Sequence, residues 1–284
     1  MGGSIYYSMK IPFFSKHIDV LTELYQLINR HRILAYEMAK QDVFDRYLGQ
    51  YFGVLWAFSH PLITIAIFVF IFTFIFLGTV SGAYSNFGYP VFLISGLIPW
   101  IAIQDVMSKS STLIINHGNL VKQVVFPLEI LPVKATLGTL FTQLCLMFFF
   151  LVYILAVYHA LPTVSLLLIP LFLIQSCGML GMSFALSATG VFFRDMKDFI
   201  QVFCGLAIYF MPVIYTADRF PPCVRWVFYV NPLSYVFLCY QDAIFYGRIT
   251  HPEAWAVITV CSAVSLLLGY KMFKLLKPMF GNVL

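Results

Sequence analysis

Residues 135 to 158 read ATLGTLFTQLCLMFFFLVYILAVY, and no aspartate, glutamate, lysine or arginine interrupts them. An α-helix rises about 1.5 Å per residue and the hydrocarbon core of a membrane is about 30 Å thick, so about 17–25 apolar residues cross it. This stretch is long enough for one crossing. It predicts a transmembrane helix over Ala135–Tyr158.

Five further stretches meet the same criterion of length and apolar character. One of them is too long for a single straight helix, and Pro162 and Pro170 predict that it begins at the membrane interface or is kinked. The six predicted spans are Pro61–Thr79, Tyr89–Met107, Ala135–Tyr158, Thr163–Phe193, Phe199–Tyr215 and Ala254–Tyr270.

The composition agrees with a membrane protein. Hydrophobic residues make up 61% of the 284 positions and charged residues 10%, whereas soluble domains have about 45–50% apolar and about 25% charged residues. The 17 basic residues exceed the 12 acidic ones only slightly, so no nucleic-acid partner is expected. The sequence predicts an all-α, polytopic membrane protein. Its N-terminal residues do not read as a cleavable signal peptide.

An apolar region from Phe220 to Tyr246 lies between the last two predicted spans. Prolines and polar residues divide it into two pieces that are too short to cross a membrane. Irregular backbone at membrane depth must be covered by protein or face water. We therefore expect a re-entrant helical hairpin within residues 217–246.

Basic residues give an independent test of this topology, because positively charged loops stay in the cytoplasm. All lysines and arginines except Arg219, Arg225 and Arg248 fall on one side of the membrane when the chain crosses six times. Both ends are then cytoplasmic. The expected organisation is a cytoplasmic tail (1–30), an interface helix (31–57), a six-helix membrane domain (58–274) and a C-terminal cytoplasmic tail (275–284).

The predicted spans contain almost no ionisable side chains. Ion-coupled carriers need such groups inside the bilayer, but only Asp105 and Lys134 lie near span ends, and no histidine lies within a span. A carrier driven by an ion gradient is therefore disfavoured. The chain has no Gly-x-x-x-x-Gly-Lys-Ser/Thr phosphate loop, so energy from ATP would have to come from another subunit.

A membrane enzyme is the competing class of function. The sequence lacks both the Asp-x-Asp site common in sugar-nucleotide transferases and the buried histidine that a membrane acyltransferase would need. We predict no catalytic, cofactor-binding or metal-binding residue. The six cysteines stand singly, and whether Cys223 and Cys239 form a disulfide stays open.

Residues just before the first span separate onto two faces of a predicted helix. Such a helix would lie in the membrane surface, and a plain anchoring helix is the simplest interpretation. Its apolar face consists of Phe44, Tyr47, Leu48, Tyr51 and Leu55, and its opposite face of Asp42, Arg46, Gly49, Gln50 and Gly53.

Several short motifs follow one another along the chain, each weak alone but specific in this order. They are Asp42, Arg46-Tyr47 and Gly53-Val54-Leu55-Trp56-Ala57 followed by Pro61, then Gly96–Trp100, Asn116 with Leu120–Pro132, Phe193-Arg194-Asp195, Met211–Tyr215, and Asn231-Pro232. From about Ile33 to Lys274, the chain resembles the type-two ATP-binding-cassette (ABC) export permeases that move polysaccharides.

Members of this family export lipid-linked polysaccharides such as O-antigen, capsule or teichoic acid, as a dimer of the permease with two separate ATPase subunits. The resemblance implies a homodimer in the cell inner membrane, with no cofactor of its own and with ATP and magnesium bound by the ATPase. O-antigen is the expected substrate. Capsule, teichoic acid, or a small lipid or drug are the alternatives, and a membrane glycosyl- or acyltransferase is disfavoured.

The resemblance also implies that residues 112–134 form a coupling loop whose short helix docks into the ATPase. Apolar anchors with a polar rim suit that role, although an ordinary amphipathic loop is the alternative. The residues expected at this contact are Asn116, Leu120, Val121, Lys122, Val124, Val125 and Glu129, together with Arg46 of the interface helix.

Aromatic rings can pack against the apolar faces of sugars, although most rings in such a chain will face lipid or other helices. In the family, the conduit lies at the dimer centre and is lined by the first, second and fifth spans. The residues expected along this path are Phe74, Trp100, Tyr209 and Tyr215, and those expected at an outer gate are Tyr229, Asn231, Pro232, Tyr235, Tyr240 and Tyr246.

Overall fold

The computed structural model describes residues 22–45, 53–75, 88–121, 126–216 and 226–283. Within these residues the secondary structure is all helical, and four helices are long and apolar enough to cross a membrane. They are α4 (Tyr89–Asn116), α6 (Ile130–Tyr158), α7 (Leu168–Phe192) and α11 (Pro252–Leu276). A shorter apolar helix, α3 (Trp56–Phe70), continues as a π-helical turn, Ile71–Ile75. The chain is a polytopic membrane protein, as predicted.

The remaining elements are short and connect or cover the long helices. They are a helix over residues 22–30, α2 (Arg32–Asp45), α5 (Gly118–Val121), α8 (Met196–Ala207), α9 (Trp226–Val230), α10 (Pro232–Gln241), α12 (Phe280–Val283), the 3-10 turns Gly53–Leu55, Thr163–Leu167, Ile208–Phe210 and Lys277–Met279, and the π-helical turn Asp242–Tyr246.

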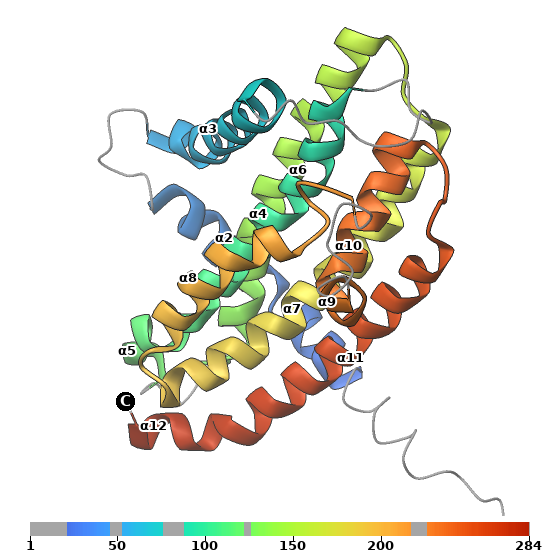
Figure 1. The fold of residues 1–284 in the computed structure, drawn as a ribbon. Helices are drawn as coiled ribbons and strands as arrows, with labels where there is room; N and C mark the ends of the chain where they lie inside the picture. The colour runs from blue at the N-terminus through green and yellow to red at the C-terminus, as the bar shows by residue number, and fades with distance from the viewer. Residues whose placement is uncertain (1–21, 46–52, 76–87, 122–125, 217–225, 284) are drawn as a thin grey trace, which may run out of the picture.

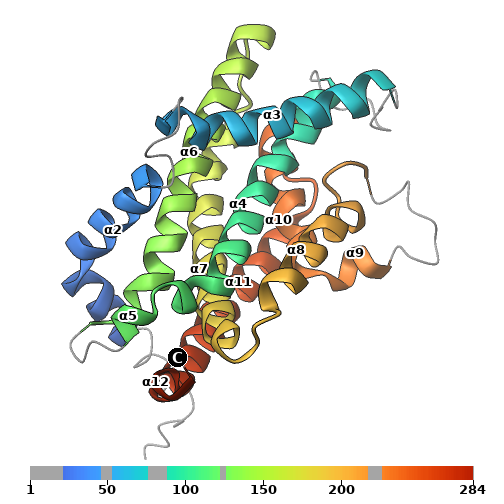
Figure 2. The same ribbon diagram turned by 90° about the vertical axis from the view of Figure 1, so that its left-hand side faces the viewer.

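The four long helices pack as one bundle with α4 at its centre (Figure 1). In the most apolar window of α4, 72% of residues are buried, against 28% in each of the other three long helices. Helices α6, α7, α8 and α10 all pack against α4. Helix α3 runs across the long helices instead of alongside them (Figure 2). We call the end of the bundle where α5 and α12 lie the α5 end.

Four predicted spans correspond to the long helices, but three of these helices extend further than predicted. Helix α4 continues past Met107 to Asn116, α6 begins at Ile130 instead of Ala135, and α11 continues past Tyr270 to Leu276. The predicted irregular start of the fourth span is confirmed, because the 3-10 turn Thr163–Leu167 precedes α7. Pro170 lies in the first turn of α7, where a missing N–H is tolerated.

The prediction of a helix over Phe199–Tyr215 is wrong in its second half. Helix α8 ends at Ala207, and after one 3-10 turn the backbone at Met211 is extended. Pro212 explains this break, because a proline disfavours helical geometry at the preceding residue and supplies no N–H. The segment that follows, residues 211–214, is nevertheless buried.

Side chains of other elements satisfy the carbonyl groups of this irregular segment. The Gln241 side-chain amide donates to the carbonyl of Pro212 at 2.6 Å, and the Tyr89 hydroxyl donates to that of Ile214 at 2.6 Å. A buried carbonyl without a partner would be costly at membrane depth. The motif Met211–Tyr215 is therefore a covered, non-helical strip between α8 and the rest of the bundle.

Helices α7 and α11 make the most extensive helix–helix contact of the bundle. Glycines allow this close approach, because a Cβ added at Gly181 would overlap the backbone of Ser265 and Leu266, and one at Gly269 would overlap Gly181. The Ser265 hydroxyl also donates to the Gly178 carbonyl at 3.2 Å. Small residues at membrane helix interfaces permit backbone contact of this kind.

Replacing Gly181 by alanine should therefore destabilise the protein. The added methyl group must push α11 away from α7, and overpacking of this kind typically costs about 1–3 kcal/mol. The melting temperature of the purified protein in detergent should fall. Gly281→Ala is the matched control, because nothing lies within 4 Å of a Cβ added there. Equal melting temperatures for the two variants would contradict the close-packing argument.

Candidate functional site

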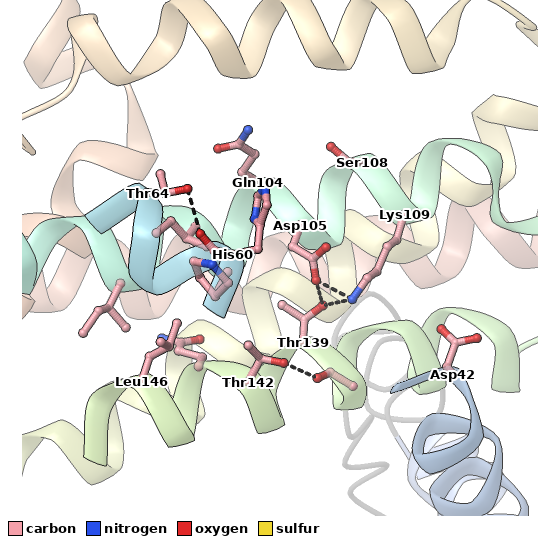
Figure 3. Close-up of a pocket in the computed structure, with 16 residues that line it drawn as sticks. Asp42, His60, Thr64, Gln104, Asp105, Ser108, Lys109, Thr139, Thr142 and Leu146 are labelled. Carbon is pink, nitrogen blue, oxygen red and sulfur yellow. Dashed lines mark hydrogen bonds and ion pairs between the residues drawn. The ribbon is translucent and has the colours of Figure 1, made fainter. Parts of the chain in front are cut away.

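A polar cleft opens beside the middle of α4. It is a cavity of about 290 Å³ between α2, α3, α4 and α6 (Figure 3). Apolar residues such as Ile98 and Leu146 line one part of it. The polar residues that line it are Asp42, His60, Thr64, Gln104, Asp105, Ser108, Lys109, Thr139, Thr142 and Gln143.

An ion pair and a hydroxyl group organise the centre of this cleft. Asp105 and Lys109, one turn apart on α4, form a salt bridge. The Thr139 hydroxyl of α6 donates to Asp105 Oδ2 at 2.6 Å, and Lys109 Nζ donates to Thr139 Oγ1 at 3.0 Å. The opposite charges balance, so the cluster offers donors and acceptors to a neutral, hydroxyl-rich ligand.

Two further polar residues of α4 were missed by the sequence analysis. Gln104 and Ser108 are exposed, although most of the helix is buried. Figure 3 shows Gln104 and Ser108 pointing away from Thr139, whereas Asp105 and Lys109 point toward it, although all four line the cleft. The signal was present in the sequence, because polar residues four apart within an apolar span share one helix face.

The residues predicted to line a sugar path occupy three different environments. Phe74 and Tyr209 are exposed, and the Tyr215 hydroxyl donates to the Tyr209 carbonyl, which brings these two tyrosines together. Trp100 is only 2% exposed and packs edge-on against Phe237 of α10, with the ring centroids 6.1 Å apart. A tryptophan at such a position packs in the protein core and does not line a sugar path.

The segment predicted as an outer gate forms two helices separated by Asn231. The Asn231 side chain accepts from the Leu233 N–H at 3.0 Å and so caps α10, and Pro232 occupies the first turn. The Tyr235 hydroxyl donates to the Tyr229 carbonyl at 2.8 Å. Residues 217–225, including Cys223, lie outside the described residues, so a complete hairpin stays a prediction.

Tyr240 and Tyr246, both predicted at the gate, differ in their surroundings. Tyr246 is half-buried and packs against Phe245 and His251. Tyr240 is 1% exposed and lies in the core. A side chain so deeply enclosed cannot contact a passing polymer in this conformation.

Tyr240 belongs to a buried network that joins three helices. Its hydroxyl donates to Gln175 Oε1 of α7 at 2.5 Å, and Gln143 Nε2 of α6 donates to the same oxygen at 2.9 Å. Gln143 Nε2 also lies 3.2 Å from the Tyr240 oxygen. Buried polar groups that satisfy one another in this way fix the position of α10 within the bundle.

Asp242, the residue after α10, holds the start of α11. Its carboxylate is fully buried and accepts from the backbone N–H groups of Thr250 at 3.1 Å and His251 at 2.9 Å. The His251 ring nitrogen Nδ1 lies 3.0 Å from the other carboxylate oxygen. A carboxylate at a helix N-terminus is also favoured by the helix dipole.

Tyr240→Phe should loosen the contact between α10 and the bundle. The variant loses a buried hydrogen bond, a change that costs about 0.5–1.5 kcal/mol. In a variant that keeps only Cys239, which is buried in α10, labelling by a maleimide should become faster. Tyr235→Phe is the control, because the hydrogen bond of Tyr235 lies at an exposed site. Equal labelling rates in the two variants would show that the network does not fix the position of α10.

Three of the residues predicted at an ATPase contact, Asn116, Leu120 and Glu129, can be placed in the described part of the chain. Asn116 is exposed and donates from Nδ2 to Thr112 Oγ1 at 3.2 Å, and Leu120 packs against an apolar cluster at the α5 end. Glu129, expected as a polar rim contact, is instead 6% exposed and paired with Lys277 at 2.6 Å. Arg46, Lys122, Val124, Val125 and the side chain of Val121 lie outside the described residues.

Comparisons with known proteins show which family the chain resembles over most of its length. A family model described as ABC-2 type transporter matches residues 36–245. The O-antigen export system permease protein RfbA of Klebsiella pneumoniae is 28% identical over 249 residues, which cover 87% of this chain and 93% of that protein.

Two further relatives align over most of the chain. The RfbA protein of Myxococcus xanthus is 25% identical over 268 residues, which cover 93% of this chain and 99% of that protein. The polysialic acid transport protein KpsM of Escherichia coli is 25% identical over 227 residues, which cover 78% and 85% of the two chains.

Proposed function

Because the chain belongs to the ABC-2 type transporter family, we propose that it is the membrane permease subunit of an ATP-driven exporter of a lipid-linked polysaccharide. O-antigen is the favoured substrate. The observation that carries this proposal is the alignment with O-antigen export permeases, which extends over 87–93% of this chain. The aligned part is long enough to include both the coupling loop and the outer segment.

The proposed exporter is a homodimer of this chain joined to two copies of a separate ATPase subunit. The chain crosses the inner membrane six times with both ends in the cytoplasm, so that the α5 end faces the ATPase. ATP and magnesium bind to the partner subunits, and this chain neither makes nor breaks a bond in the glycan. The lack of a phosphate loop in the sequence supports this division of labour.

The exposed apolar face of α8 is evidence that either a second copy of the chain or lipid lies beside that helix. Ile200, Cys204 and Ala207 of α8 are buried against the bundle. A second apolar face is exposed among the residues that the structure describes, and it extends from α8 into the 3-10 turn that follows. It consists of Phe199, Val202, Phe203, Leu206, Tyr209 and Phe210. Exposed apolar surface of this extent marks a lipid or protein contact.

The polar groups of α4 are our candidates for the start of the glycan path. Gln104 and Ser108 are exposed, and the neighbouring cleft contains the Asp105–Lys109–Thr139 cluster. Such groups exchange hydrogen bonds with sugar hydroxyls, and the opposite charges of Asp105 and Lys109 leave the cluster without a net charge. Phe74, Tyr209 and Tyr215 remain proposed path residues, and the buried Trp100 is withdrawn.

Capsular polysaccharide is the second candidate substrate. The alignment with the polysialic acid transport protein KpsM favours it, although that alignment covers less of this chain than those with the O-antigen permeases. Teichoic acid, a small lipid or a drug are weaker alternatives that no relative named above supports. The identity of any glycan retained in a deletion strain distinguishes these substrates.

Deletion of the gene for this chain, or of the gene for its ATPase, tests the proposal directly. Finished, lipid-linked glycan should accumulate on the cytoplasmic side in both strains and disappear from the cell surface. The intact gene supplied in trans should restore the surface glycan. Unfinished glycan chains, or none, would instead favour an enzyme of synthesis and contradict the proposal.

The combined change Val121→Asp and Val124→Asp should release the ATPase from the membrane subunit. Carboxylates cannot enter an apolar cleft without a large loss of hydration, so the ATPase should no longer co-purify. Ala160→Asp is the control, because this exposed residue lies between α6 and α7 at the end of the bundle away from α5. Co-purification of the double variant with the ATPase would show that the loop does not form this contact.

A further inference from the structure

A buried lysine joins three elements at the α5 end. Lys134 lies in the first two turns of α6 and is only 3% exposed. Its Nζ lies 2.9 Å from Asp42 Oδ1 of α2 and 3.0 Å from Nε2 of His117, the residue that follows α4. An ammonium group removed from water requires partners of this kind.

The hydrogen bonds of His117 define its role in the contact. Its Nδ1 lies 2.8 Å from the carbonyl oxygen of Leu113, and because a carbonyl can only accept, Nδ1 carries the hydrogen. Nε2 of the neutral ring then has a lone pair that accepts from the Lys134 ammonium group. Lys134 therefore donates to both α2 and the residue at which the chain leaves α4.

The central part of the coupling loop, between His117 and Glu129, is held at both of its ends by side-chain contacts. His117 immediately precedes α5, and Glu129 immediately precedes α6. Glu129 Oε1 accepts from Lys277 of the turn after α11 at 2.6 Å. The first end is thus tied to α2 through Lys134, and the second end is tied to the C-terminal segment.

Asp42 and Lys134 are far apart in sequence but adjacent in space, because α2 packs along α6 (Figure 2). Helix α2 leads along the chain toward α3, which begins at Trp56. The ammonium group of Lys134 is therefore a polar link between the loop and the helix that leads to α3, beside the apolar packing of α2 on α6. Because Lys134 is buried, its ammonium group depends on Asp42 and His117 as partners.

We propose that Lys134 is the positioning residue that transmits movement of the coupling loop to α2 during transport. This inference rests on the proposed function, because it presumes an ATPase that moves the loop. Lys134 contacts neither ATP nor glycan in this mechanism. It keeps α2, the end of α4 and the start of α6 together, so that they shift as one body when the ATPase subunits close.

The test uses Lys134→Met, Asp42→Ala and the double variant in the full complex. Two quantities are measured: polysaccharide at the cell surface, and ATP hydrolysis by the purified complex in lipid nanodiscs. Each single variant should reduce surface polysaccharide by about fivefold or more, the scale of a typical coupling between sites. ATP hydrolysis and co-purification with the ATPase should stay near those of the unmodified protein, because only transmission is lost.

The double variant distinguishes transmission from two independent defects. If Asp42 acts through Lys134, the double variant should export as much as Lys134→Met alone. Lys274→Met is the matched control: it removes a lysine that pairs with Glu23 at 2.6 Å, but both side chains are about half exposed and contribute little as a pair. Its surface polysaccharide should be unchanged.

Three results would overturn the inference. The first is unchanged export by an assembled Lys134→Met complex. The second is a fold-reduction of export in the double variant that equals the product of the two single reductions. The third is an equal fall in ATP hydrolysis and export. If Lys134→Met does not accumulate in the membrane, Asp42→Ala decides alone, because Asp42 is one-third exposed and its truncation leaves no buried cavity. Loss of the ATPase without effect on surface polysaccharide in the unmodified strain would contradict the proposed function instead.

Discussion

Inside a bilayer, no water is available to bond with a backbone N–H or C=O group, so the chain must satisfy these groups itself. The long helices α4, α6, α7 and α11 do so through their own hydrogen bonds. At the places where the helices stop, other groups must therefore satisfy the backbone N–H and C=O groups. At Pro212 and Ile214, the side chains of Gln241 and Tyr89 replace the missing helical partners, and at the start of α10 and α11 the side chains of Asn231 and Asp242 do the same.

The same constraint explains the distribution of charge. The charged groups of the described residues that are buried occur where partners are present: Asp242 at the start of α11, and Glu129 and Lys134 at the α5 end. Two of these three, Glu129 and Lys134, lie in the second half of the proposed coupling loop, residues 112–134. In both cases the buried charge joins segments that are far apart in sequence.

Much of the fold could be predicted from the sequence, because span length and apolar character are local properties. The four long helices and the division at Asn231-Pro232 follow from them. The end of α8 was harder, since Met211–Tyr215 is as apolar as a helix and only Pro212 indicates a break. Its covering groups, Tyr89 and Gln241, come from distant positions that no local pattern relates to it.

The candidate site was less predictable than the fold. Trp100 and Tyr240 are aromatic residues in apolar stretches, and the sequence cannot tell whether such a ring faces a path or the core; the structure places both in the core. Glu129 lies in a loop sequence, but Lys277 covers it. The partnership of Lys134 with Asp42 depends on how α2 packs along α6, which composition and spacing do not specify. The sequence identifies the residue types, but which residues lie next to one another becomes known only from the folded structure.

Transport by the purified components tests the central claim most directly. This chain and its ATPase would be reconstituted in lipid vesicles that hold a lipid-linked glycan only on the ATPase-facing leaflet, and an added lectin would measure the glycan that reaches the opposite leaflet. We predict that the glycan reaches that leaflet when ATP and magnesium are added, and not when the ATPase subunit is omitted. Lectin binding that is the same with and without ATP would contradict the account.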